Sequence, residues 1–297
     1  MRDFFLEKQQ ESGFGIVEFN LNYSHSIFGD EMKTFILLHG SYHGAWNWHK
    51  IIPLLQKLGH QAISIDMPGH GLDRKKIHAA TLSDYVNKTV QVIQAVEGKV
   101  ILLAHSRNGI VISRVAEKIP EKIEKLIYLA SYLIPNGKSM MEYALLDRKS
   151  LVIQNTVPKI SLKLASRLIK NYNGYKKTLI DLFLPKIYRT HRLSQHIFQE
   201  ALYHDCPLEI TELANVLLTP EPNLGGFEKL KLTEERYGKI PKIYIECLQD
   251  RAVTLFLQRK MQKDSPCDRV FQIDSSHSPF FSKPKELCEI LNEIARK

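Results

Sequence analysis

Long hydrophobic runs are missing from this sequence. Its longest apolar stretches, such as Phe35–Leu38 and Val100–Ala104, have the length of a strand and not of a membrane span. The N-terminal segment lacks the apolar core and small-residue cleavage site of a signal peptide, so we expect a cytoplasmic protein. The four cysteines are widely spaced and form no CxxC pair. This spacing argues against a zinc knuckle or a redox dithiol and predicts free, mostly buried thiols. No metal or organic cofactor is expected.

Nucleic-acid-binding motifs are also missing, although the formal net charge is +9. Without an RNA-recognition motif, a zinc finger or a recognition-helix signature, we expect no nucleic-acid partner. Lys159, Lys163, Arg167 and Lys170 recur at helical spacing opposite apolar residues, which predicts a basic amphipathic helix. A solvated outer face explains this helix better than a membrane or partner surface does, and membrane contact is a less favoured alternative.

Short apolar runs alternate with helical patterns along much of the chain, which is typical of parallel strands joined by helical crossovers. The expected strands are Thr34–Leu38, Ala62–Asp66, Val100–Ala104, Leu126–Ala130, Lys242–Cys247 and Arg269–Ile273. The expected helices are Trp46–Lys57, Leu82–Val96, Gly109–Lys118 and Pro284–Ala295. Because the strands are almost continuously apolar, we predict an α/β fold whose mostly parallel central sheet is flanked by helices.

This alternation stops after Ser131, where the sequence becomes helical and basic without a clear strand. We therefore expect a helical cap over residues 132–238, inserted after the fourth core strand, where loops commonly form a lid over the ligand crevice. Residues 32–131 and 239–297 would then form the α/β core. Residues 1–31 would be an N-terminal extension, either edge strands or a loosely held tail.

The segment Val100–Pro120 contains the most informative motif. An apolar strand runs directly into Ala104-His105-Ser106-Arg107-Asn108-Gly109, and an amphipathic helix follows at once. This is the context of a nucleophile elbow, in which a strained strand-to-helix turn presents a serine above the sheet. The motif departs from G-x-S-x-G, because Ala104 and Asn108 replace the two flanking glycines. Ser106 is therefore a candidate nucleophile, and an ordinary helix N-cap serine is the alternative.

A second motif is the strand Phe35–Leu38, which ends in a His-Gly turn and continues as Ser41-Tyr42-His43-Gly44-Ala45-Trp46. In α/β-hydrolases this loop supplies one backbone N–H of the oxyanion hole, and the residue after the nucleophile supplies the other. By position these donors are the amides of Ser41 and Arg107. We expect the side chains of His39 and His43 to stabilise the turn.

Both motifs together resemble the family of plant methylesterases, salicylate-binding esterases and hydroxynitrile lyases, with their bacterial esterase relatives. The likeness runs from about residue 33 to the C-terminus and includes KIYIECLQDRAV and IDSSHSPF. It implies an α/β-hydrolase fold. It also implies that Asp250 is the catalytic acid and His277 the catalytic base, so that Ser106, Asp250 and His277 form the triad. Asp274 is a rival acid that lies too close to His277 in the sequence, and Asp66 is expected to organise its own turn.

The family contains esterases and lyases, which differ at two positions. The lyases resemble a version with threonine in place of the glycine of the His-Gly turn and lysine after the catalytic histidine, whereas this chain has Gly40 and Ser278. We therefore predict a serine hydrolase that cleaves a small, largely apolar carboxylic ester, including methyl esters, through an acyl-serine intermediate. A hydroxynitrile-lyase-like enzyme and a non-catalytic small-molecule receptor are the alternatives.

The expected partner is a small-molecule ester, and a homodimer is an open alternative. Arg107 is unusual in the plant members of the family. Its side chain would attract an acidic acyl group or, as the simpler interpretation, point into the helix surface or form a local ion pair.

Overall fold

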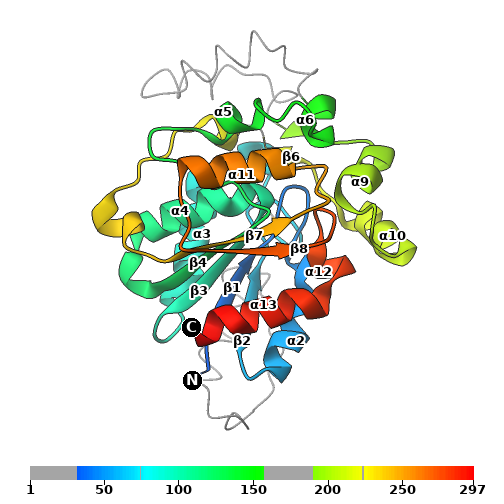
Figure 1. Cartoon of the computed structure of the whole chain (residues 1–297). Coiled ribbons are helices and arrows are strands. Elements are labelled where there is room, and N and C mark those ends of the chain that lie inside the picture. The colour runs from blue at the N-terminus through cyan, green and yellow to red at the C-terminus, as the bar shows by residue number, and fades with distance from the viewer. Residues whose placement is uncertain (1–31, 74, 157–189, 223) are drawn as a thin grey trace.

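The computed structural model describes residues 32–73, 75–156, 190–222 and 224–297, and it places a parallel sheet between layers of helices (Figure 1). The six strands lie in the order β2-β1-β3-β4-β7-β8. Their bounds are Thr34–Leu38 (β1), Gln61–Ile65 (β2), Val100–His105 (β3), Ile123–Leu129 (β4), Lys242–Cys247 (β7) and Arg269–Ile273 (β8). All neighbouring strands in this sheet pair in parallel. The predicted α/β fold with a mostly parallel central sheet is confirmed.

Both faces of the sheet are buried, which explains why its strands are apolar at nearly every position. Along β3, Leu102 and Ala104 join one core cluster, and Ile101 and Leu103 join the other. One face is covered by α3 (Leu82–Gln94), α4 (Gly109–Lys118) and α11 (Leu255–Asp264). The other is covered by α2 (Ile51–Lys57), α12 (Pro279–Ser282) and α13 (Pro284–Arg296).

The helix expected over Trp46–Lys57 is divided in the structure. A 3₁₀ turn occupies Ala45–Trp48, and α2 begins only at Ile51. Pro53 gives the physical reason: it has no N–H to donate and is tolerated in the first turn of a helix but not in its interior. A helix that starts at Ile51 places Pro53 in the first turn.

The segment between β4 and β7 contributes the elements that stand over the carboxyl ends of the strands in Figure 1. They are α5 (Met140–Ala144), α6 (Leu151–Thr156), α9 (Gln195–Leu202), α10 (Leu208–Leu217) and the antiparallel pair β5 (Thr190–His191) and β6 (Glu221–Pro222). The expectation that this segment contains no clear strand is therefore wrong. A pair of two-residue strands is too short to leave an alternating pattern in the sequence.

Some predictions fall on parts of the chain that the structure does not describe. The N-terminal extension over 1–31 and the basic helix with Lys159, Lys163, Arg167 and Lys170 lie outside the described residues, and the division into core and cap stays a prediction. Within the described ranges, every helix is too short or too polar to cross a bilayer. Of the free cysteines, Cys247 and Cys288 are buried, whereas Cys206 and Cys267 are partly exposed.

Candidate active site

Ser106 stands directly after β3 and opens a short 3₁₀ turn that leads into α4. Its φ is 56°, a left-handed conformation that costs a non-glycine residue of the order of 1–3 kcal/mol. Neighbouring groups hold it there: its carbonyl accepts hydrogen bonds from the Tyr132 amide at 2.9 Å and from the Ser131 hydroxyl at 2.5 Å. This is the strained strand-to-helix turn expected of a nucleophile elbow. It differs from a helix N-cap, because the Ser106 side chain caps no helix.

The structure also explains how the elbow tolerates Asn108. The close approach of backbones falls one residue later, at Gly109, where an added Cβ would lie 2.4 Å from the Tyr132 carbonyl oxygen. Asn108 itself has an ordinary φ of −73°. Its side-chain amide donates a hydrogen bond of 2.6 Å to the His39 carbonyl and so ties the elbow to the end of β1. The replacement of this glycine therefore leaves the turn intact.

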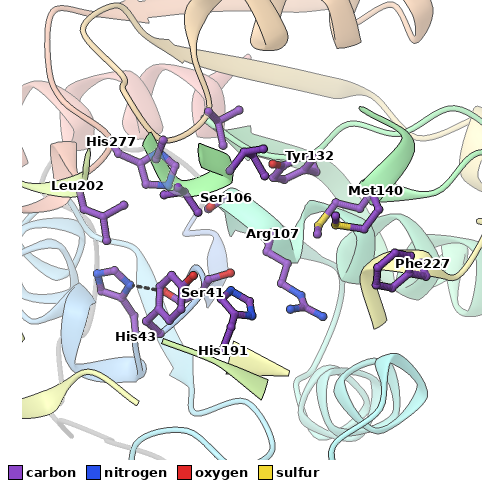
Figure 2. Close-up of a pocket in the computed structure, with 16 residues that line it drawn as sticks. Ser41, His43, Ser106, Arg107, Tyr132, Met140, His191, Leu202, Phe227 and His277 are labelled. Carbon is purple, nitrogen blue, oxygen red and sulfur yellow. Dashed lines mark hydrogen bonds between the residues drawn. The ribbon is translucent and has the colours of Figure 1, made fainter. Parts of the chain in front are cut away.

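Asp250 and His277 come from the loops that follow β7 and β8, and the structure brings them into contact. His277 Nδ1 lies 2.6 Å from Asp250 Oδ2. The other carboxylate oxygen accepts the amides of Ala252 at 2.7 Å and Val253 at 2.9 Å. Because Asp250 accepts from Nδ1–H, the Nε2 atom of His277 is left to act as a base, and Figure 2 shows the His277 ring beside Ser106.

The rival carboxylates occupy other positions. Asp274 is exposed and accepts a hydrogen bond from Gln249. Asp66 accepts the amides of Ala45 and Leu72 and so organises the turns around it, as predicted.

The amides of Ser41 and Arg107 are the donors predicted for the oxyanion hole. Neither amide donates a hydrogen bond within the part of the chain that the structure describes. Both residues line the same cavity as Ser106 and His277. A hydrogen bond stabilises the loop that carries Ser41: His43 Nδ1 lies 2.7 Å from the Ser41 carbonyl oxygen (dashed in Figure 2). Free donors on a fixed loop are what stabilisation of a developing oxyanion requires.

Buried histidines support this loop and the elbow. Burial lowers the pKa of His43 to about 3 and that of His39 to about 4. Burial also lowers the pKa of His105 well below its usual value. As a neutral ring, His105 donates its Nε2–H to the His277 carbonyl at 2.8 Å, and His43 Nε2 accepts from the Tyr203 hydroxyl at 2.6 Å. These side chains stabilise turns, as predicted for His39 and His43.

The cavity in front of Ser106 has a volume of about 90 Å³. Its apolar wall comes mostly from the segment over the sheet and includes Met140, Ile153, Leu202 and Phe227, whereas Tyr132 and His191 add polar groups. Such a wall fits an apolar group bound to the carbonyl carbon under attack. Within the described residues, no group of three or more His, Cys, Asp or Glu side chains is arranged to hold a metal ion.

The His-Gly turn bears on the choice between esterase and lyase. A Cβ at Gly40 would lie 2.5 Å from His105 Nδ1 and 2.9 Å from the Ser106 Cβ. A threonine here, as in the lyases, would therefore displace His105 or Ser106. Ser278, where the lyases have lysine, is fully buried. Both positions favour ester hydrolysis over the lyase reaction.

The sequence did not point to one part of this site. The Arg107 side chain is buried and forms an ion pair with Glu221 of β6, with Arg107 Nη1 at 2.9 Å from Glu221 Oε1. Arg107 thus forms an ion pair, but the pair is not local as expected, because Glu221 is distant in the sequence. Glu221 stands between two prolines in a two-residue strand, so no periodicity or motif could have identified it.

Comparisons with known proteins agree with this geometry. A model of the alpha/beta hydrolase family matches residues 35–290. Methylesterase 9 of Arabidopsis thaliana is 32% identical over 274 residues, which cover 90% of this chain and 99% of that protein. The relative named putative methylesterase 11, chloroplastic, of Arabidopsis thaliana is 33% identical over 273 residues, and the chain spans only 65% of its length.

Solved structures extend the likeness. Polyneuridine aldehyde esterase aligns with a TM-score of 0.67 at 24% identity, over 89% of this chain and 100% of that one. A methylesterase from Arabidopsis aligns with a TM-score of 0.69 at 24% identity, over 89% of this chain and 98% of that one. At these identities the structural likeness supports the fold alone.

Proposed function

The chain belongs to the α/β-hydrolase family and is a carboxylic ester hydrolase of its plant methylesterase group, and we propose that Ser106, His277 and Asp250 are its catalytic triad. The observation that carries this assignment is the strained elbow. Ser106 has a φ of 56° at the wall of an apolar cavity, beside a histidine that is hydrogen-bonded to a buried aspartate.

The proposed reaction has two halves. Ser106 Oγ attacks the ester carbonyl carbon and gives its proton to His277 Nε2, and the oxyanion accepts hydrogen bonds from the Ser41 and Arg107 amides. The carbon–oxygen bond then breaks, and His277 returns the proton to the departing alcohol. Water attacks the acyl-serine in the same way and releases the acid. Asp250 stabilises the imidazolium form of His277 in both halves.

The proposed substrate is a small ester with a largely apolar acyl group and a small alcohol such as methanol. The apolar cavity wall supports the acyl part, and the methylesterase relatives support the alcohol. The small-molecule partner and the cytoplasmic location remain proposals from the sequence.

The test is hydrolysis of p-nitrophenyl esters with acyl chains of increasing length, followed by a panel of methyl esters. We expect turnover by the wild type and loss of nearly all activity in Ser106→Ala and in His277→Ala. A fluorophosphonate should label the wild type but not Ser106→Ala. A wild type that neither hydrolyses esters nor takes the label would favour the receptor alternative, and full activity in Ser106→Ala would refute the proposed nucleophile.

A further inference from the structure

A buried carboxylate connects the β5–β6 pair to the elbow. Glu221 is 1% exposed and Arg107 is 6% exposed. Arg107 Nη1 lies 2.9 Å from Glu221 Oε1 and also donates to the Pro222 carbonyl. Figure 2 shows the Arg107 side chain extending away from Ser106, between His191 and Phe227. Even a paired and hydrogen-bonded buried ion pair often stabilises a fold no more than apolar residues of similar size would, so this arrangement calls for a reason beyond stability.

The second oxygen of the same carboxylate holds the oxyanion loop. Glu221 Oε2 accepts the amide N–H of Tyr42 at 2.8 Å. Tyr42 directly follows Ser41 and has a φ of 68°, a strained conformation for a residue with a large side chain. The Thr219 amide donates to the Tyr42 carbonyl at 2.8 Å. Glu221 of β6 and Thr219, which lies just before this strand, therefore hold Tyr42 by its amide and its carbonyl and maintain its strained backbone.

The charges around Glu221 are balanced by Arg107. His70 Nε2 lies 3.5 Å from Glu221 Oε2. Burial, together with the positive charge of Arg107, lowers the pKa of His70 to about 3, so this ring is neutral near pH 7. Among the described residues, Arg107 is therefore the side chain that supplies the positive charge opposite Glu221. One carboxylate thus joins the two residues whose amides are the proposed oxyanion donors, Arg107 directly and Ser41 through Tyr42.

We propose that Glu221 is a positioning residue for ester hydrolysis, which holds the Ser41 and Arg107 amides in the alignment that the oxyanion requires. The proposal rests on the proposed function, because it presupposes an oxyanion bound by these two amides. Glu221 does not line the cavity, so it acts through Tyr42 and Arg107 and not through contact with the substrate. The segment over the sheet would then complete the catalytic machinery and not only cover the pocket.

This role predicts a specific kinetic signature. A positioning defect weakens binding of the transition state but leaves binding of the ground state nearly unchanged, so kcat should fall while KM stays similar. Loss of one complete oxyanion donor typically costs about 10²–10³ in rate. Misalignment of two donors that both remain present should cost less, and we expect about 10–100-fold for Glu221→Ala.

The experiment measures three quantities in each variant: kcat and KM for a p-nitrophenyl ester, the Ki of a trifluoromethyl ketone, and the Ki of the carboxylic acid product. The ketone forms a hemiketal with the nucleophile and places an oxyanion in the hole, whereas the acid product reports ground-state binding. For Glu221→Ala, we expect the ketone Ki to rise by the same factor as kcat/KM falls, with the product Ki within about twofold of wild type. Glu221→Gln keeps an acceptor for the Tyr42 amide and should recover much of the loss.

A matched control is available in the same part of the chain. Glu228 pairs with Arg114 of α4, so Glu228→Gln removes another glutamate–arginine pair, which is more exposed than the Arg107–Glu221 pair and includes no residue of the elbow or of the oxyanion loop. We expect this control to match wild type in all three measurements. Thermal unfolding of each variant separates a positioning defect from loss of folded protein.

The proposal is overturned if kcat/KM falls in Glu221→Ala while the ketone Ki does not change, or if Glu228→Gln shows the same losses. If Glu221→Ala does not fold, Glu221→Gln decides, and the proposal then requires a measurable rise in the ketone Ki that parallels its loss of kcat. Normal kinetics in Glu221→Gln together with normal kinetics in Arg107→Met would also overturn it. Failure of the proposed function is seen separately, as a wild type without turnover or a Ser106→Ala variant that keeps it, and either result overturns the positioning role as well.

Discussion

The buried histidines around the site predict an unusual sensitivity to mild acid. Burial lowers the pKa of His39 to about 4 and that of His43 to about 3. It lowers the pKa of His70 to about 3 and that of His105 well below its usual value. In the unfolded chain each ring titrates near a pKa of about 6.5. Between these values the unfolded state binds more protons than the folded state, so stability is present above about pH 6.5 and is lost as the pH falls.

The loss of stability at pH 5.5 is nearly independent of the pKa of each histidine in the folded state, as long as that pKa lies well below 5.5. At a pH one unit below the pKa in the unfolded chain, each ring that stays neutral in the folded state lowers the free energy of unfolding by about 1.4 kcal/mol. Four such rings together remove roughly 5–6 kcal/mol, which is a large part of a typical stability of about 5–15 kcal/mol. For a chain of this size, we expect the Tm to drop by roughly 10 °C between pH 7.5 and pH 5.5.

Thermal unfolding followed by circular dichroism at a series of pH values is the assay. His70→Gln removes one proton-linked group and should shrink the difference in stability between pH 7.5 and 5.5 by about 1.4 kcal/mol. His196 is exposed, so His196→Gln should leave that difference unchanged. A Tm that stays flat from pH 7.5 to 5.5, and falls only below about pH 4 where carboxylates titrate, would refute the reasoning.

Three further predictions concern the site itself. In Gly40→Ala the added Cβ would lie 2.5 Å from His105 Nδ1, so kcat/KM for ester hydrolysis should fall at least about tenfold. The variant should release no cyanide from a mandelonitrile. Wild-type kinetics in Gly40→Ala would contradict the close packing. Asp250→Asn presents an amide donor to His277 and favours the wrong tautomer. Its kcat should fall by up to about 10⁴, less than in Ser106→Ala, and an unchanged kcat would refute the acid assignment. Gly109→Ala should lower the Tm sharply, because the added Cβ would lie 2.4 Å from the Tyr132 carbonyl oxygen. Asn108→Gly should lower the Tm much less, because it removes only the hydrogen bond to the His39 carbonyl. Equal Tm values for the two variants would contradict this contrast.

The sheet was predictable because burial on both faces leaves a strong pattern in the sequence. The strands Thr34–Leu38, Lys242–Cys247 and Arg269–Ile273 were predicted with their observed bounds. Helix α4 was predicted with its observed bounds as well, since a glycine and a lysine mark its ends. Helix α11 (Leu255–Asp264) was missed, because its polar residues are dispersed among few apolar ones and give a weak periodic signal.

The proposed triad and the proposed support of the oxyanion loop differ in how clearly the sequence signals them. Ser106 carries a local signal, because a strand, a turn and a helix meet at the nucleophile within a few residues. Asp250 and His277 required the family likeness, since a single aspartate or histidine after a strand is a weak signal. Glu221 required the structure: its partners Tyr42 and Arg107 are distant in sequence, and the pairing exists only once the chain is folded.

The elbow shows why a search for the literal G-x-S-x-G motif is less reliable than the steric requirement behind that motif. A pattern that demands glycine two residues after the nucleophile would reject this chain because of Asn108. What the turn needs is a residue without a Cβ wherever the backbones meet, and here that place is Gly109, beneath the Tyr132 carbonyl oxygen. With the contact shifted by one residue, position 108 is free to carry an amide that fastens the elbow to the end of β1. The departure from the motif therefore adds a link between the nucleophile turn and the oxyanion loop, and it argues for an intact hydrolase site over a silent receptor.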